Sequence, residues 1–351
     1  MPQYQIFDAE DKIVETTKVT TGYFSDGGGI LEGSDMVTQS LTASQAQYYA
    51  NIRKSGTTTD EFSITFGNRP GLGSSDVTGH TKGIYQYYAD LLLFPDEIED
   101  VGFQFVSGST EDNIFVIAAE RARMKDRFNR KNWTLVLSGS NGAGAGAKLE
   151  LTDDSAYTAA TPTPVGNRYN IISGTAGTGF NGGGTGSFYA AGHPYGYVYP
   201  NLGLLVMDGT ALAAQIPGVA VESGSSVAAN ADGVGFQMDS ASSAANHLKL
   251  FHTLKSGSFT ARSEEDQITT SYFVRARAAH WNFSNNPTFY SASNGTDATF
   301  SVSEFTGNPQ TFITTIGLHD AQGTCVAVGR LSTPVLKNFS TEFTAKVNLV
   351  H

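Results

Sequence analysis

The stretch that decides the fold begins with Phe312-Ile313-Thr314-Thr315-Ile316-Gly317-Leu318, a run of β-branched and aromatic residues. A polar turn, Asp320-Ala321-Gln322-Gly323, leads into Thr324-Cys325-Val326-Ala327-Val328-Gly329-Arg330-Leu331, in which apolar residues alternate with small or polar ones. Alternation with a period of two is typical of strands, and the short Asp-to-Gly connection predicts a hairpin. After a break at Pro334, Phe343–Val350 alternates in the same way. These antiparallel strands need a second layer to cover their apolar face.

The composition also favours β-structure. Of 351 residues, 40% are hydrophobic and only 16% are charged, against about a quarter in typical globular domains. The polar surface must therefore consist of Ser, Thr, Asn, Gln and Gly, which suits a β-rich protein with long loops or a chain whose surface is used in an assembly. The 22 Phe and 15 Tyr against 2 Trp also fit sheets, where aromatic side chains pack well.

We therefore predict a mainly β protein, an antiparallel β-sandwich with a few helices and a Gly-rich loop insertion. Apolar residues at helical spacing predict three helices, at Ser44–Arg53, Lys82–Leu93 and Ser243–Lys255. Changes in composition divide the chain into four parts: an N-terminal arm (1–36), a first β-sandwich portion with helices (37–138), a Gly/Ser/Thr-rich insertion (139–194) and a C-terminal β-sandwich portion (195–351).

The N-terminal arm has few apolar residues, yet Gln5-Ile6-Phe7 and Lys12-Ile13-Val14 look like short strands. Such segments gain most by joining the open edge of another sheet, because main-chain hydrogen bonds then supply the affinity. Gly27-Gly28-Gly29 would act as the hinge. We expect Ile6, Phe7, Ile13 and Val14 to contact a neighbouring subunit.

The charge distribution bears on partners. A net charge of −11 argues against a surface that binds nucleic acid, which needs Lys and Arg to displace counterions. Basic residues cluster only between Arg121 and Lys131, and the candidate interaction residues there are Arg121, Arg123, Lys125 and Arg127. The cluster either binds an anion, contacts another subunit or pairs with neighbouring carboxylates.

The sequence carries little that predicts catalysis or a bound metal. Cys325 is the only cysteine, so an intrachain disulfide and a zinc site built on cysteines are excluded, and we expect its side chain to be buried. Gly177–Gly182 matches the dinucleotide fingerprint without the helix that must follow it, and Asn230–Gly233 imitates a calcium loop with wrong ligands. We expect no cofactor, no metal, no signal peptide and no membrane span.

Two alternatives stay open. Asp153-Asp154 would supply half of a glycosidase carboxylate pair, but neighbours on a strand point to opposite sides, so the partner must come from elsewhere. Aromatic residues in Tyr195–Tyr199 and Trp281–Tyr290 would stack on sugar rings or pack in a core or interface. Trp281 is the candidate contact for a glycan.

Several segments resemble a known group of proteins. Ser40-Leu41-Thr42 with Gln47–Ile52, Phe62–Arg69, and Thr81–Tyr85 with Leu91–Leu93 are similar to the N-terminal part of virion structural proteins of contractile-tailed bacteriophages. Three later segments resemble later parts of the same group: Ile114–Ser138, Tyr195–Asp208 and Arg275–Val350. The helix, the Ile-Thr-Phe-Gly motif and the Gly/Ser loop are also similar to the start of a baseplate wedge subunit. Together these segments cover roughly half the chain.

The resemblance implies a non-enzymatic structural subunit of a phage tail or baseplate, assembled in the host cytoplasm and incorporated into the virion. The wedge subunit is a β-sandwich protein that dimerises, so the resemblance implies a homo-oligomer, a dimer, within a larger assembly of virion proteins. The alternative is a receptor- or glycan-binding module of the same particle, similar to a fibre or adhesin.

Overall fold

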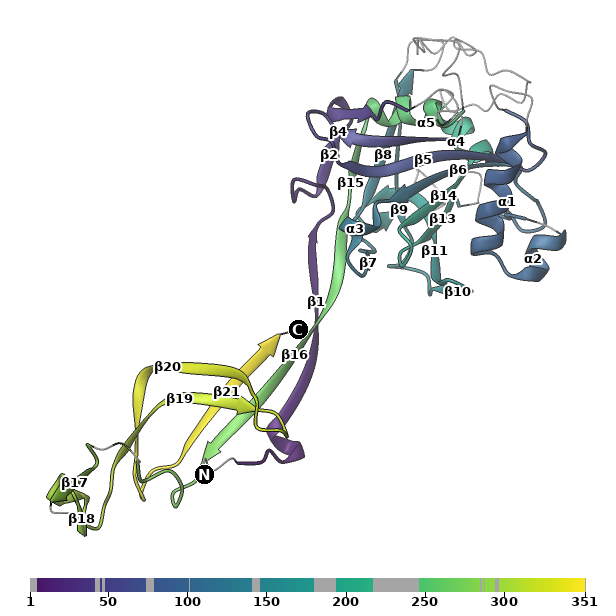
Figure 1. Ribbon diagram of the computed structural model, residues 1–351. Coiled ribbons are helices and arrows are strands. Elements are labelled where there is room, and N and C mark those ends of the chain that lie inside the picture. The colour runs from purple at the N-terminus through teal and green to yellow at the C-terminus, as the bar shows by residue number, and fades with distance from the viewer. Residues whose placement is uncertain are drawn as a thin grey trace. The chain divides into compact units, whose positions relative to one another are not determined.

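The computed structural model describes residues 5–41, 45, 48–73, 79–100, 102–140, 146–179, 194–216, 246–284, 286, 288–293 and 297–350. The chain is mainly β with antiparallel sheets and few helices, as predicted (Figure 1). It divides into two compact units, unit 1 (Met1–Thr17 and Asp266–His351) and unit 2 (Lys18–Glu265). The chain passes between the units within β1 (Lys12–Gly22) and β16 (Arg262–Ala276).

Unit 2 is built on a large antiparallel sheet of 13 strands. Its order is β2 (Ile30–Glu32), β15 (Ser258–Thr260), β8 (Thr134–Ser140), β9 (Gly146–Asp153), β11 (Gly166–Thr175), β13 (Gly196–Tyr199), β14 (Leu204–Asp208), β6 (Asn113–Ala119), β5 (Asp60–Asn68), β4 (Tyr49–Lys54) and β3 (Met36–Thr38). Two short strands, β10 (Thr161–Thr163) and β12 (Thr178–Gly179), pair with β11.

The connection between β2 and β3 shows how this sheet is curved. These strands stand at opposite ends of the sheet order, yet only the 3₁₀ turn η2 (Gly33–Asp35) separates them in sequence. Three residues span at most roughly 10 Å, so the two end strands must lie near each other. The sheet is therefore nearly closed.

Both faces of this sheet bury apolar side chains. In β6, Phe115 and Ile117 belong to one core cluster, whereas Ile114 and Val116 belong to a second. The alternation follows from the opposite directions of successive side chains in a strand. A continuous apolar run is therefore required wherever both faces are covered.

Helices of unit 2 cover or fill these cores. Helix α1 (His80–Leu92) contributes Tyr85, Tyr88, Ala89 and Leu92 to the second cluster, and α5 (Asn246–Lys255) contributes Leu250, Phe251 and Leu254 to the first. The remaining helices are short: α2 (Pro95–Asp100), α3 (Arg121–Met124) and α4 (Gly209–Gln215). The predicted helix at Lys82–Leu93 is confirmed. That at Ser243–Lys255 is confirmed from Asn246 onward, and residues 243–245 lie outside the described part of the chain.

The predicted helix at Ser44–Arg53 is wrong. Tyr49–Lys54 forms β4, which pairs with β3 and β5. Ala50 and Ile52 are buried while Tyr49, Asn51 and Arg53 are less so, which is the period-two alternation of a strand. Pairing with two neighbours outweighs the local helical spacing, because propensity is a weak prior against tertiary contacts.

Two predicted boundaries also differ from the structure. Within 139–194, β9 and β11 are central strands whose Leu149, Leu151, Tyr169 and Ile171 join the main core, so the described part of this segment is no loop-rich insertion. Residues 12–38 are no free arm either. They pair with strands of their own chain and bury Tyr23, Phe24, Leu31 and Met36 in the same core.

Unit 1 contains the alternating segments between Phe312 and Val350. β1 and β21 (Phe343–Val350) flank β16, and β19 (Thr311–His319) forms a hairpin with β20 (Cys325–Lys337). A third pair is β17 (Tyr290–Ser293) with β18 (Asp297–Phe300). The short strand β7 (Arg127–Phe128) pairs with the unit 2 end of β16, and two further 3₁₀ turns are η1 (Ala9–Asp11) and η6 (Ser303–Phe305).

The predicted hairpin is confirmed, with its turn held by Asp320, whose Oδ1 accepts hydrogen bonds from the amides of Gln322 (3.0 Å) and Thr324 (2.7 Å). The predicted break at Pro334 is wrong, because β20 runs through it. The register shifts between Ile313 and Thr315 on the partner strand. Proline is tolerated at such an irregularity because no ladder hydrogen bond is required there.

Candidate interaction surfaces

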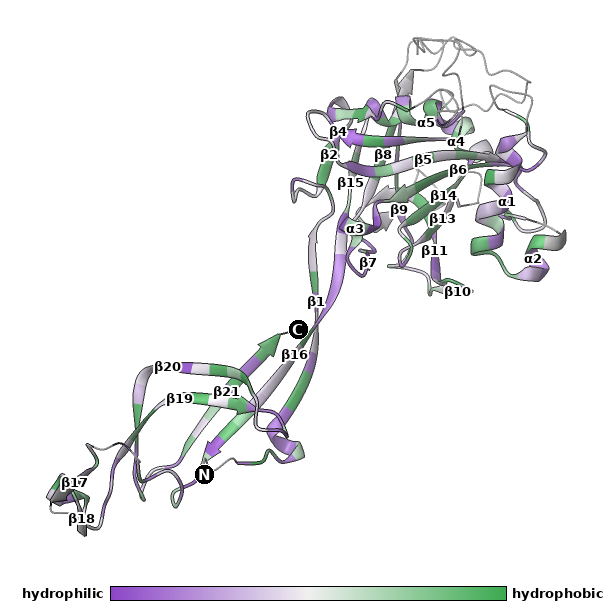
Figure 2. Cartoon of the chain, in the orientation of Figure 1, coloured by the Kyte–Doolittle hydropathy of each residue, from purple (hydrophilic) through white to green (hydrophobic). Residues whose placement is uncertain are grey.

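Unit 1 leaves much of its apolar surface exposed. Both core clusters consist of unit 2 residues alone. Among the described residues of unit 1 the buried hydrophobic side chains are few: Ala276, Phe289, Ile316 and Leu318. Phe312, Val328 and Val350 are 64%, 65% and 62% exposed, and Figure 2 shows apolar segments along β19 and β21. These side chains lie on two sheets of unit 1, the β19–β20 hairpin and the sheet that ends in β21. Exposed apolar side chains on neighbouring strands of a small unit indicate a surface that another molecule covers.

The strands that carry these side chains also have open edges. Among the described residues, β21 pairs only with β16, and β19 and β20 pair only with each other. Along β21 the side chains alternate between half-buried and exposed, and none is fully buried. An edge with unpaired amide and carbonyl groups can accept a further strand.

The predicted N-terminal contact residues lie in unit 1. Ile6, Ile13 and Val14 are exposed, while the Phe7 ring packs on Tyr272 of β16 with ring centroids 5.3 Å apart. Ile13 and Val14 belong to β1. Three of the four predicted residues are therefore accessible to a partner, and Phe7 is engaged within its own unit.

The basic cluster is used within unit 2. Arg123 pairs with the buried Glu61 at 3.4 Å, Arg127 with Glu264 at 2.6 Å, and Lys125 with Glu265 at 2.9 Å. Arg121 donates to the carbonyl of Asp126 at 3.1 Å. Of the three roles that the sequence left open, pairing with carboxylates is the one observed.

Glu264 anchors much of this network. Burial alone would raise the pKa of its carboxyl, but hydrogen bonds from Arg127 and Lys18 outweigh burial and hold the pKa below its usual range. The Asn129 amide adds a third hydrogen bond at 2.8 Å. The carboxylate therefore stays ionised and ties separate segments of unit 2 together.

Trp281 lies on the surface of unit 1, where its side chain is 44% exposed. Its backbone adopts the left-handed conformation, with φ +63°. Its carbonyl accepts a hydrogen bond of 2.6 Å from the hydroxyl of Thr311. Phe283 and Phe339 are also exposed and meet edge to face at 6.1 Å. The loop thus presents aromatic rings to solvent, as a glycan-stacking or subunit-contact role requires.

A buried lysine that no sequence pattern indicates holds this loop in place. The side chain of Lys337 is fully buried. Its Nζ donates to the Ala278 carbonyl (3.0 Å), to Asn282 Oδ1 (2.8 Å) and to the Asn338 carbonyl (2.9 Å). Burial lowers the pKa of this ammonium group. All three of its donors are matched by neutral acceptors, which is how a buried cation is tolerated.

The carboxylates considered for glycosidase chemistry have structural partners. Asp153 accepts from the Lys131 amide (2.8 Å) and from the Ser155 amide (3.0 Å). Asp154 accepts from the amide of Asn170 at 3.0 Å and from its side chain at 2.7 Å. These hydrogen bonds join the end of β9 to neighbouring segments, and they satisfy the two buried carboxylates.

A second acidic pair, Glu111 and Asp208, lies beside α4. The Glu111 carboxylate accepts hydrogen bonds from the Asn113 amide (3.0 Å) and the Thr210 hydroxyl (2.9 Å), and Asp208 caps α4 by accepting from the Ala211 amide. Burial, reinforced by the Asp208 charge, raises the pKa of Glu111 to about 7. Glu111 therefore titrates near neutrality.

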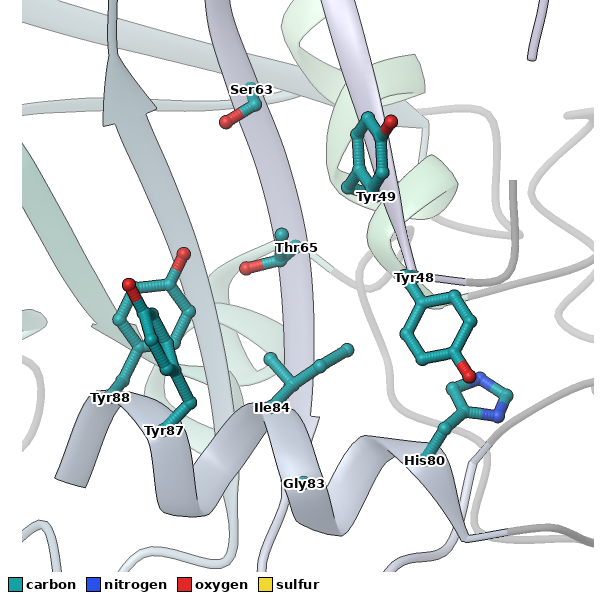
Figure 3. A pocket seen from close by; sticks show the side chains of 9 residues that line it. All are labelled: Tyr48, Tyr49, Ser63, Thr65, His80, Gly83, Ile84, Tyr87 and Tyr88. Atoms are coloured by element: carbon teal, nitrogen blue, oxygen red, sulfur yellow. The ribbon is translucent and has the colours of Figure 1, made fainter. Parts of the chain in front are cut away.

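A pocket of about 620 Å³ lies between α1 and the outer face of β4 and β5 (Figure 3). The described residues that line it are mostly aromatic or hydroxyl-bearing and include no carboxylate, lysine or arginine: Tyr48, Tyr49, Ser63, Thr65, His80, Gly83, Ile84, Tyr87 and Tyr88. We call it the tyrosine pocket. On α1 the lining residues recur every three or four positions, which places them on one side of a helix.

The remaining predictions have mixed outcomes. Cys325 is exposed, so the expectation that it is buried is wrong. The alternation that predicted its strand does not show which face is covered. The calcium-like loop and residues 180–182 of the glycine fingerprint lie outside the described residues. Within the described part of the chain, no three His, Cys, Asp or Glu side chains could hold a metal ion together, and no helix is long and apolar enough to span a membrane.

Three comparisons with known proteins complete the description. No protein-family model, no curated protein and no solved structure matches this chain.

Proposed function

We propose that the chain is a non-enzymatic structural subunit of a phage tail or baseplate, and that it assembles with other virion proteins and with itself through unit 1. The observation that carries this proposal is the exposed apolar surface of unit 1, on strands whose edges are open. Such a surface is costly in a free monomer and is covered in an assembly. The resemblance of the sequence segments to virion structural proteins supplies the class of assembly.

The physical role follows from this division of the chain. Unit 2 has large cores and a nearly closed sheet, so it can fold without a partner. Unit 1 buries few apolar side chains of its own and gains stability when a neighbour packs against it. A neighbouring strand added to β21 or to the β19–β20 hairpin would satisfy main-chain groups without special side chains.

The proposal is tested by exchanging exposed apolar side chains of unit 1. The double variant Phe312→Ser, Val328→Ser should fold, because both side chains are exposed, but should no longer enter particles. The matched control is Phe94→Ser, an exposed apolar residue of unit 2. Quantitative mass spectrometry of purified particles reads incorporation. Equal incorporation of the parent chain, the double variant and Phe94→Ser would contradict the proposal.

The alternative, a receptor- or glycan-binding module of the same particle, is favoured by the exposed aromatic loop at Trp281. Glycan binding by the purified chain that is lost in Trp281→Ala would support it. Turnover of a polysaccharide by the purified chain would contradict both proposals.

A further inference from the structure

The tyrosine pocket has two aromatic walls that face a gap. On one side the Tyr48 and His80 rings are in contact, with centroids 4.8 Å apart. On the other side Tyr87 and Tyr88 meet at 5.1 Å. Figure 3 shows these two pairs on either side of Ile84 and Gly83. The pocket therefore offers flat apolar surfaces with hydroxyl groups at their edges, since tyrosine combines an apolar ring with a polar tip.

Small residues on both sides of the pocket help to keep the gap open. Gly83 lies in the middle of α1 between the two aromatic pairs, and a Cβ added there would meet no other atom within 4 Å. Opposite it, β5 presents Ser63 and Thr65 outward while Phe62 and Ile64 point into the main core. Larger side chains at these places would fill the space that the pocket occupies.

The floor of the pocket carries hydroxyl groups. Thr65 Oγ1 is shielded from solvent. Its hydroxyl interacts with the Tyr88 hydroxyl, which offsets part of the rise that burial causes in the pKa of Tyr88. A hydroxyl oxygen has two acceptor lone pairs and one donor hydrogen, so a ligand hydroxyl can add a hydrogen bond here.

We propose that the tyrosine pocket binds a neutral saccharide unit. The apolar face of the sugar ring stacks on the exposed ring of Tyr87 or Tyr48, which are 62% and 46% exposed, and sugar hydroxyls hydrogen-bond to Ser63, Thr65 and Tyr49. The volume lies within the range of roughly 300–1,000 Å³ that is usual for small-molecule pockets. This binding goes beyond the proposed structural role and does not depend on it.

The composition of the lining selects this ligand class. Among the described residues, no carboxylate, lysine or arginine side chain lines the pocket, so the rings and hydroxyl groups present favour an uncharged ligand. A purely apolar ligand would displace water from the hydroxyls of Ser63 and Thr65 without replacing its hydrogen bonds. A flat, uncharged ligand rich in hydroxyl groups fits both the rings and the floor.

The test uses the full chain on an array of neutral oligosaccharides of glucose, galactose, mannose and their N-acetylated forms, followed by calorimetric titration of the saccharide retained best. Tyr87→Ala removes one wall, and Gly83→Phe fills the gap. Both should weaken binding at least ten-fold. Tyr157→Ala, an exposed tyrosine elsewhere in unit 2, and Trp281→Ala in unit 1 are the controls and should bind as the parent does.

Retention of no neutral saccharide would overturn the proposal, as would stronger retention of choline or of a proline-rich peptide than of every sugar. Unchanged binding in Tyr87→Ala would also overturn it, and Tyr87 is exposed, so this variant should fold even if Gly83→Phe does not. Loss of binding in Trp281→Ala alone would place the sugar at the unit 1 loop and exclude the tyrosine pocket.

Discussion

Replacing Lys337 by methionine tests how unit 1 holds its aromatic loop. Methionine keeps the length and the apolar stem of the side chain but removes the ammonium group. Two carbonyls and one amide oxygen then lose a donor at 2.8–3.0 Å. A lost hydrogen bond costs about 1 kcal/mol, and more where the abandoned acceptor stays buried. We therefore expect unit 1 to lose about 3 kcal/mol of stability.

The assay is hydrogen–deuterium exchange followed by mass spectrometry, because the chain has two units and one melting temperature need not describe both. Peptides covering 277–283 and 336–342 should exchange faster in Lys337→Met, while peptides of unit 2 should not change. Lys346→Met is the matched control, because Lys346 lies on an exposed position of β21. A loss below about 0.5 kcal/mol, of the size expected for an ordinary surface substitution, would refute the reasoning.

Two further predictions concern unit 2. Gly83→Ala should stabilise it by about 1 kcal/mol, because alanine is the better residue inside a helix and its Cβ meets no atom. Gly71→Ala should destabilise it, because φ is +92° there and the added Cβ would lie 3.2 Å from the Cβ of Lys82. Thermal unfolding of both variants should show a higher melting temperature for Gly83→Ala and a lower one for Gly71→Ala than for the parent chain. The pKa of Glu111 is about 7 in the folded chain, against an ordinary value of 4.5. Between these pH values the folded state therefore binds more protons than the unfolded state. The stability of the folded state should fall as the pH rises from about 4.5 to about 7. Glu111→Gln should flatten this dependence in denaturant titrations across that range, and an unchanged slope would contradict the assignment.

The parts of the fold that the sequence predicts well are those with a strong local pattern. The hairpin of β19 and β20 is confirmed because alternation and turn chemistry agree there, and α1 is confirmed because Tyr85, Tyr88 and Leu92 repeat at helical spacing. Where local and tertiary preferences differ, the sequence misleads. β4 has helical spacing, yet it is a strand because β3 and β5 pair with it.

The candidate surfaces were harder to predict. The alternation along β21 places its side chains on the two faces of the strand. It does not show that neither face is fully covered within unit 1. The tyrosine pocket joins residues from β4, β5 and α1, and no spacing in the sequence links them. The partners of the basic cluster, Glu61 and Glu264, are distant in sequence, so only the fold shows that these charges are paired.

A cryo-electron microscopy map of the intact particle would show directly what covers unit 1. We expect the chain in the tail or baseplate, with Phe312, Val328 and Val350 against another subunit and a neighbouring strand or sheet beside β21 or the β19–β20 hairpin. A particle without the chain, or one in which every copy leaves these side chains facing solvent, would contradict this expectation.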